Sequence, residues 1–271
     1  MLAKRFARWA GLLSLLAATE AIHAAPVWQV TPEGTGPGGA VAVQALNVGG
    51  AGFVQIIPDA ANPTAFTFIE HGAYQALQAD GVTPFGRRDL TITYAVSGSG
   101  SFLNPTALRF NAGSIRLFAD SVFDFGSAAG NYGADNGTAL ARFDVIGGGV
   151  NANGLVNVSA TLAGGSLLPG YLFAADGSDL AGTSGIFMNL GVFNQPTQPD
   201  GLFVSEIISG LAAYTGPGCD GTPYANSPLA FAVRDGGFVG VTVPEPGSLG
   251  ISLAGLGLLG FARRRRAPAA G

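Results

Sequence analysis

Runs in which apolar and polar residues alternate recur along the middle of the chain, and they restrict its fold more than any other feature. In the run 90–96 every even-numbered residue is apolar, and two of the three residues between them are threonine. A strand places successive side chains on opposite faces, so such a run buries one face and exposes the other. Further strand-like runs lie at 53–57, 66–69, 115–119, 140–146, 156–162, 202–208, 229–233 and 238–243.

Glycine punctuates these runs, with 43 glycines in 271 residues and Asp-Gly pairs at 80–81, 176–177, 200–201, 220–221 and 235–236. Asp-Gly favours tight hairpin turns because glycine accepts positive φ without steric cost. The only helical candidate in the body is the run 73–79, between Gly72 and Gly81. Short strands joined by turns predict an all-β fold, an antiparallel β-sandwich or jelly-roll-like body. Its expected core includes Leu90, Ile92, Tyr94, Phe143, Val145, Val156 and Val158.

The N-terminus has the pattern of a secretory signal peptide. Lys4, Arg5 and Arg8 form a basic region, and the apolar run 9–18 follows it. Small residues then lead to Ala24 and Ala25, and we expect signal peptidase to cleave between these two alanines. Residues 1–24 are therefore predicted to be a signal helix that is removed on export.

The C-terminus combines a proline-flanked motif, an apolar run and a basic cluster. Val243, Pro244, Glu245 and Pro246 come first, and the prolines prevent helix or strand pairing across them. The 14 uncharged residues 249–262 follow. As a helix they would span about 21 Å, less than the roughly 30 Å hydrocarbon core of a bilayer. The cluster Arg263, Arg264, Arg265 and Arg266 is expected to stay on the cytoplasmic side, which places the preceding chain outside.

This order and spacing resemble the PEP-CTERM sorting signal of Gram-negative bacteria, which covers about a tenth of the chain. The same tail is sometimes labelled an ice-binding protein C-terminal domain. The resemblance implies recognition of residues 243–246 by an integral-membrane exosortase, a transient anchor in the inner membrane, and a final place at the cell surface or outside the cell. An ordinary C-terminal anchor is the alternative, although such an anchor is normally longer and less rich in glycine.

Between the two ends, residues 25–243 form one predicted domain, and 244–271 form the sorting signal. The domain contains six arginines, no lysine and fifteen carboxylates, so its formal net charge is −9. Nucleic-acid binding requires lysine and arginine to neutralise phosphates, so this composition argues against a nucleic-acid partner. Cys219 is the only cysteine, which excludes an intrachain disulfide.

The sequence of this domain contains no recognisable catalytic motif, and we predict no catalytic residue and no metal ligand. His71 is its only histidine, which removes histidine-based zinc clusters, and we expect it in an exposed loop at a strand end. Two groups of loop oxygens remain as candidates for calcium, although aspartate in loops usually serves turns. These groups are Asp120, Asp124, Asp135 and Asn136 in one loop, and Asp176 and Asp179 in another.

Two short segments, 68–74 and 167–173, resemble parts of flocculation-associated PEP-CTERM proteins, which are exported with exopolysaccharide machinery. The resemblance implies a surface or matrix protein, not an enzyme, that acts with exopolysaccharide in adhesion, biofilm formation or flocculation. The alternative is an exported hydrolase that uses paired carboxylates on matrix polysaccharide.

The two ends give a direct prediction about the mature protein. Protein recovered from the surface of the producing cell should begin near Ala25 and lack Arg263 to Arg266. Intact-mass measurement tests this, and an arginine tail retained on most surface molecules would instead indicate a simple anchor.

Overall fold

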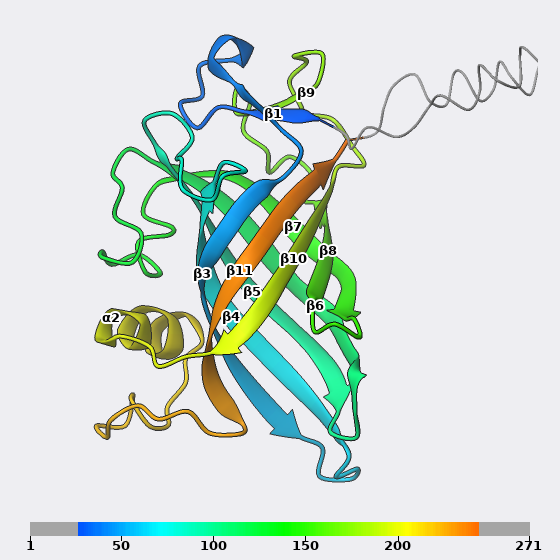
Figure 1. The fold of residues 1–271 in the computed structure, drawn as a ribbon, viewed down its shortest axis with the longest axis vertical. Coiled ribbons are helices and arrows are strands. Elements are labelled where there is room, and N and C mark those ends of the chain that lie inside the picture. The colour runs from blue at the N-terminus through cyan, green and yellow to red at the C-terminus, as the bar shows by residue number, and fades with distance from the viewer. Residues whose placement is uncertain (1–26, 244–271) are drawn as a thin grey trace, which may run out of the picture.

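Eight antiparallel strands form a closed barrel (Figure 1) in the computed structural model, which describes residues 27–243. The expected signal helix, the Ala24–Ala25 cleavage site, residues 244–246, the C-terminal helix and Arg263 to Arg266 lie outside the described residues. Around the barrel the strands are β10 (Phe187–Pro196), β11 (Ala230–Thr242), β3 (Leu46–Pro58), β4 (Ala65–Leu77), β5 (Asp89–Ser101), β6 (Asn104–Asp120), β7 (Thr138–Val150) and β8 (Val156–Leu162).

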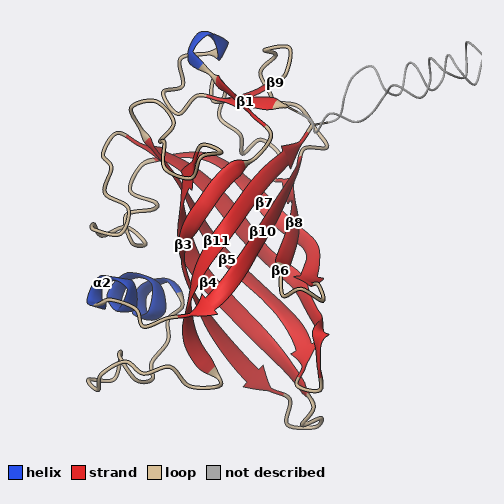
Figure 2. Cartoon of the chain, viewed as in Figure 1, coloured by secondary structure: helices blue, strands red, loops and turns tan. Residues whose placement is uncertain are grey.

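The remaining elements lie at one end of the barrel and on its outer face (Figure 2). Strands β1 (Trp28–Val30), β2 (Val41–Val43) and β9 (Leu172–Ala174) form a three-stranded sheet at one end, with the short 3₁₀ turn η1 (Pro37–Gly39) beside it. A helical segment formed by α2 (Gly201–Phe203) and η2 (Val204–Leu211) connects β10 to β11. None of the helices in residues 27–243 is long and apolar enough to cross a membrane.

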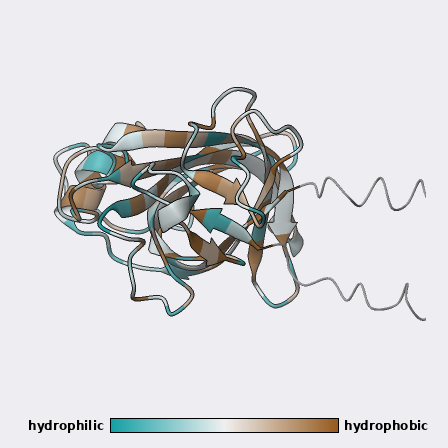
Figure 3. Ribbon diagram, turned by 90° about the horizontal axis from the view of Figure 1, so that it is seen from above, coloured by the Kyte–Doolittle hydropathy of each residue, from teal (hydrophilic) through white to brown (hydrophobic). Residues whose placement is uncertain are grey.

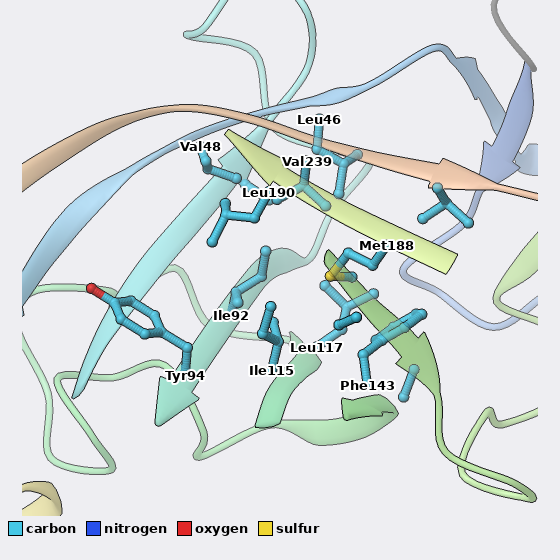
Figure 4. Packing of buried hydrophobic residues seen from close by; sticks show 14 of the residues in the cluster. Leu46, Val48, Ile92, Tyr94, Ile115, Leu117, Phe143, Met188, Leu190 and Val239 are labelled. Carbon is cyan, nitrogen blue, oxygen red and sulfur yellow. The ribbon is translucent and has the colours of Figure 1, made fainter. Parts of the chain in front are cut away.

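Alternation fills the barrel with apolar side chains, as the sequence predicts. Leu90, Ile92, Tyr94, Phe143, Val145, Val156 and Val158 are all buried. Several of them meet Leu46, Met188 and Val239 inside the barrel (Figure 4). Trp28, Val30 and Leu172 of the small sheet belong to the same core and cover one end of the barrel. From above, brown and paler bands are mixed along the ribbons because the residues between the core positions face outward (Figure 3).

The all-β prediction is confirmed, but the expected sandwich is wrong because the sheet closes on itself. β10 pairs with both β8 and β11, and β11 pairs with β3, so no barrel strand is left as an edge. Register shifts between β5 and β6, β6 and β7, and β7 and β8 mark bulges. Bulges increase the local twist and bend a strand, which helps a sheet to curl into a barrel. Alternation is the same in a sandwich and in a barrel, so it does not separate the two.

Three predictions of local structure are also wrong. The helix candidate 73–79 lies largely in β4, where pairing with both β3 and β5 outweighs its helix-forming alanines. The predicted strand 202–208 is helical, and its buried residues Phe203, Ile207 and Ile208 have helical spacing. The pair Asp235-Gly236 forms no turn, because 230–242 is one continuous strand, β11.

A second apolar cluster lies outside the barrel, under the helical segment. Phe203, Ile207 and Ile208 pack there against Phe53 of β3 and Ala232 of β11. The small side chains Ala73 and Ala230 belong to the same cluster. The helical segment therefore covers one part of the outer wall, and neighbouring parts of the wall stay accessible.

Glycine at position 72 is a packing requirement that can be tested. A Cβ there would lie 2.5 Å from the Ala51 carbonyl oxygen and 2.6 Å from Tyr94 Cζ, whereas a Cβ at Gly49 would meet nothing within 4 Å. Overpacking of this kind costs about 1–3 kcal/mol. Gly72→Ala should therefore lower the urea midpoint clearly, and Gly49→Ala should change the free energy of unfolding by less than about 0.5 kcal/mol. Equal midpoints for the two variants would contradict this packing.

Candidate functional site

Two carboxylates meet inside the barrel, Glu70 of β4 and Asp235 of β11. The Tyr94 hydroxyl lies 3.2 Å from Glu70 Oε1 and 3.1 Å from Asp235 Oδ2. The Tyr74 hydroxyl donates to Asp235 Oδ2 at 3.0 Å, and the two tyrosine rings stack with centroids 4.8 Å apart. Glu70 and Asp235 are only 6% and 3% exposed. We call these four residues the inner cluster.

Glycines make room for the inner cluster. A Cβ at Gly52 would run into the Tyr94 hydroxyl, and it would lie 3.3 Å from Asp235 Oδ2 and 3.4 Å from Glu70 Oε1. Gly72 is similarly close to the Tyr94 ring. At these two wall positions the barrel therefore has no side chain, which leaves room for the hydroxyl and carboxyl groups of the inner cluster. In the sequence, the only sign of this space is the pair of glycines at inward-facing strand positions.

Burial controls the ionisation of the inner cluster. Burial and, to a smaller extent, the negative charge of Asp235 raise the pKa of Glu70 from 4.5 to about 8, although hydrogen bonds from Tyr94 and Asn194 oppose the rise. Burial also raises the pKa of Asp235, and the hydrogen bonds from Tyr74 and Tyr94 oppose this. A buried carboxyl group is least costly when it is neutral and hydrogen-bonded, so the cluster retains a proton at neutral pH.

The loop aspartates predicted as calcium candidates accept hydrogen bonds within their own turns. Asp176 Oδ1 accepts from the Ser178 hydroxyl and from the Ser178 amide, the latter at 2.9 Å, and these two hydrogen bonds, the hydroxyl first, lower the pKa of Asp176. Asp179 Oδ1 accepts from the Ala181 amide at 2.8 Å in its own turn, and its Oδ2 accepts from the Gly170 amide, on the other side of β9, at 2.7 Å. Within residues 27–243 no three His, Cys, Asp or Glu side chains converge as metal ligands.

The first calcium group, in the loop between β6 and β7, behaves in the same way. Asp120 Oδ1 accepts from the Val122 amide at 2.9 Å, and Asp124 Oδ2 accepts from Asn136 at 3.0 Å. Asp135 accepts a hydrogen bond from the Asn131 side chain. The loop uses these oxygens to hold its own backbone and side chains.

The domain's only histidine, His71, and its only cysteine, Cys219, are both partly buried. His71 is in the middle of β4, not in an exposed loop as predicted, and burial lowers its pKa. Its Nδ1 has no hydrogen-bond partner among the described residues. Cys219 is a free, half-buried thiol that packs at the edge of the outer apolar cluster.

A groove of about 700 Å³ lies on the outer wall, beside the helical segment. Its floor is made by Gly49, Gly50 and Ala51 of β3 and Gly236 of β11. One side is formed by the end of β10 and the connection 197–200, and the other by Phe125 and Tyr132 of the β6–β7 loop. We call this the outer groove.

Sequence reasoning missed the outer groove because its residues come from five separate segments. The signal that could have pointed to it is a pairing of small residues, since Gly236 faces Gly49 across two neighbouring strands. Only the register shows that these glycines are adjacent. The pairing of Glu70 with Asp235 was missed for the same reason.

A comparison with known protein families matches residues 242–266 to the PEP-CTERM protein-sorting motif. The chain carries a PEP-CTERM sorting signal. The matched range includes Val243 to Pro246 and Arg263 to Arg266. The signal begins where β11 ends, at Thr242. It indicates an exported protein that is targeted by exosortase, and it is consistent with a cell-surface or extracellular destination. No curated protein and no solved structure matches the chain.

The inner cluster gives a prediction for stability against pH. The pKa of Glu70 is higher in the folded than in the unfolded protein, so the unfolded chain releases this proton first as the pH rises. The contribution of Glu70 to the free energy of unfolding should therefore be highest below pH 4.5, and it should fall as the pH rises to about 8. Glu70→Gln keeps the shape of the side chain but cannot ionise. Thermal melts at several pH values should therefore show a smaller loss of stability with rising pH for this variant than for the parent protein.

Asp144→Asn is the matched control, because Asp144 is a half-exposed carboxylate paired with Arg142 on the outer face. It should keep the pH dependence of the parent protein. A Glu70→Gln variant with the same slope as the parent would show that Glu70 does not titrate in this range.

Proposed function

We propose that the protein is a non-enzymatic surface or matrix protein that associates with exopolysaccharide in adhesion, biofilm formation or flocculation. The observation that carries the proposal is the sorting signal at 242–266, directly after the last barrel strand. The whole barrel therefore precedes the segment that exosortase reads. A domain in that position stays outside the cell as one unit when the tail is processed.

The proposed topology follows from the two ends of the chain. Signal peptidase removes residues 1–24 during export, and the apolar run 249–262 then holds the protein in the inner membrane for a time. Arg263 to Arg266 remain on the cytoplasmic side. Exosortase then acts near residues 243–246, and the barrel is delivered to the surface or the matrix.

The positions of the carboxylates favour a binding role without a metal cofactor. A carboxylate-dependent hydrolase needs two carboxyl groups that face the substrate in a cleft. Glu70 and Asp235 approach each other through Tyr94, but their side chains are almost fully buried in the barrel. The loop aspartates at 124, 176 and 179 accept hydrogen bonds from their own loops and turns.

The two segments that resemble flocculation-associated proteins lie in different parts of the fold. Residues 68–74 form part of β4 in the barrel wall, and residues 167–173 lead into β9 in the small sheet. Both contribute buried residues to the core, Phe68 and Tyr74 from the first and Leu167 and Leu172 from the second. Their likeness therefore supports a similar body, and the proposed role still depends on the sorting signal.

Glu245 tests the proposal, because it is the only charge between the barrel and the apolar run. Glu245→Ala and Glu245→Gln keep both prolines and therefore the extended backbone, but remove the charge. We expect either variant to accumulate uncut in the inner membrane and to be lost from the surface by more than tenfold. Cell fractionation with immunoblotting measures this, and cell aggregation should decrease in parallel.

Asp144→Asn removes a half-exposed carboxylate far from the tail in sequence, and it should be processed and displayed like the parent protein. If Glu245→Ala is also processed and displayed normally, the motif acts only as a linker. If display is lost but aggregation is unchanged, the sorting role stands and the adhesive role is wrong.

A further inference from the structure

We propose that the outer groove binds an acidic polysaccharide, with the sugar rings packed against its aromatic walls and a carboxylate of the polymer paired with Arg234. This inference rests on the proposed function and adds the site and the class of ligand. It is carried by four features of the groove: an open floor, rigid aromatic walls, polar side chains without protein partners, and one unpaired positive charge.

The floor of the groove lies low because it has almost no side chains. Gly49 and Gly236 face each other across β3 and β11, and a Cβ built at either one would meet nothing within 4 Å. A sugar ring can therefore approach the backbone of two neighbouring strands. The floor also continues along β3 into Gly50 and Ala51, which add no side chain larger than a methyl group.

The aromatic walls are held rigidly. Tyr132 packs edge-on against both Phe125 and Phe203, with ring centroids 5.5 Å and 5.4 Å apart. Its hydroxyl donates to Asp200 Oδ2 at 2.7 Å, and the Gly130 amide donates to Glu206 Oε2 at 2.9 Å. These bonds tie the β6–β7 loop to the helical segment. The C–H faces of a pyranose ring are apolar, so a fixed aromatic wall gives them a surface to pack on.

Polar side chains around the groove are available for hydroxyl groups. Asn47, Gln195 and Gln198 line it, and none of the three side chains has a hydrogen-bond partner among residues 27–243. An amide carries both donors and acceptors, as a sugar hydroxyl does. Gln75 also lines the groove, where its amide nitrogen already donates to Asp89 Oδ1 at 2.9 Å.

Arg234 determines the charge of the proposed ligand. It lines the groove from β11, and within residues 27–243 no carboxylate lies within salt-bridge distance of it. Two carboxylates also line the groove, Asp200 and Asp235, and both already accept hydrogen bonds. Asp200 is engaged at both oxygens by Phe203 and Tyr132, and Asp235 Oδ2 accepts from Tyr74 and Tyr94 of the inner cluster. An arginine fork fits a carboxylate in two hydrogen bonds, so the groove offers a place for one acidic group. The acidic remainder of the surface acts weakly beyond a Debye length of about 8 Å at physiological salt.

Exposed phenylalanines extend this surface along β10 and β11, which favours a polymer over a single sugar. Phe193 at the groove is 51% exposed, and Phe238 and Phe187 farther along the outer wall are 47% and 41% exposed. The Phe238 ring lies across Gly191 of the neighbouring strand. Phe187 and Phe193 are six residues apart on β10, a span of about 20 Å at the usual strand rise. That length matches several linked sugar rings.

The polar residues of this outer face also fit a carbohydrate. Asn189 lies between the two phenylalanines on β10, and its side chain accepts a hydrogen bond from Ser159 of β8 at 3.0 Å. Asn157 lies farther along β8 and is exposed. A surface that alternates aromatic rings with amide and hydroxyl groups offers both kinds of contact that a sugar chain makes.

The test measures binding of the full chain to three polymers: polygalacturonate as an acidic polysaccharide, dextran as a neutral one, and polyglutamate as an acidic polymer without sugar rings. The parent protein should bind polygalacturonate more tightly than dextran, and should not bind polyglutamate measurably. Affinity electrophoresis or biolayer interferometry gives the dissociation constants. Binding to polygalacturonate should weaken as salt rises from 50 to 500 mM, because an arginine–carboxylate contact is screened.

Two substitutions locate the site. Arg234→Gln should weaken polygalacturonate binding about tenfold or more, which corresponds to the loss of a charge-assisted contact, and should remove most of the salt dependence. Gly236→Leu should fill the groove floor and abolish binding to both polysaccharides. The matched controls are Arg142→Gln, an arginine on β7 that is already paired with Asp144, and Gly147→Leu, a glycine on β7 with equally open space. Both controls should bind like the parent.

Each other outcome overturns part of the inference. Equal affinity for dextran and polygalacturonate would refute the acidic ligand and the role of Arg234. Equal affinity for polyglutamate would show a charge effect without sugar recognition. Loss of binding in the controls as well as in the two variants, or no binding to any polysaccharide, would refute the groove as the site. None of these results affects surface display, so the Glu245 variants test the proposed function separately.

Discussion

Closure of the hydrogen-bonded sheet is the constraint on which the rest of the structure depends. β11 pairs with β3 along ten residues, and β10 pairs with both β11 and β8. The first and last barrel strands therefore satisfy each other's backbone hydrogen-bonding groups. An open sheet would expose a row of unpaired amides and carbonyls, which promotes aggregation outside the cell. Closure also defines an inside, where apolar residues such as Ile92 and Phe143 are buried, and an outside, where the helical segment and the outer groove lie.

Glycine has two different functions in this wall. Gly52 and Gly72 face inward and leave space for the Tyr94 hydroxyl, so the two buried carboxylates can share hydrogen bonds in the core. Gly49 and Gly236 face outward and leave the floor of the groove open. Buried polar groups cost free energy unless they are hydrogen-bonded, and the inner cluster meets this condition only in part, because Asp235 Oδ1 has no partner among the described residues.

The proposed role combines a C-terminal sorting signal with a barrel whose outer surface is proposed to bind polysaccharide. The sorting signal follows β11 without a separate domain between them, so processing leaves the barrel with little extra chain. The exposed phenylalanines and part of the outer groove lie on β10 and β11, the strands nearest that end of the chain in sequence. Polysaccharide binding on this wall needs no opening of the core, in agreement with a barrel whose interior is filled.

The sequence by itself determined the sorting signal at 242–266, the all-β class and most of the core, because motifs, alternation and glycine-rich turns are local in the chain. Tertiary structure decided the rest. It made 73–79 mostly strand, since β4 has partners on both sides, and 202–208 helical, since Asp200 caps a segment that packs on the outer wall. It also chose a barrel over a sandwich, paired Glu70 with Asp235, and assembled the groove from five segments. These features depend on which strands are neighbours and in what register, and a single sequence does not specify either one.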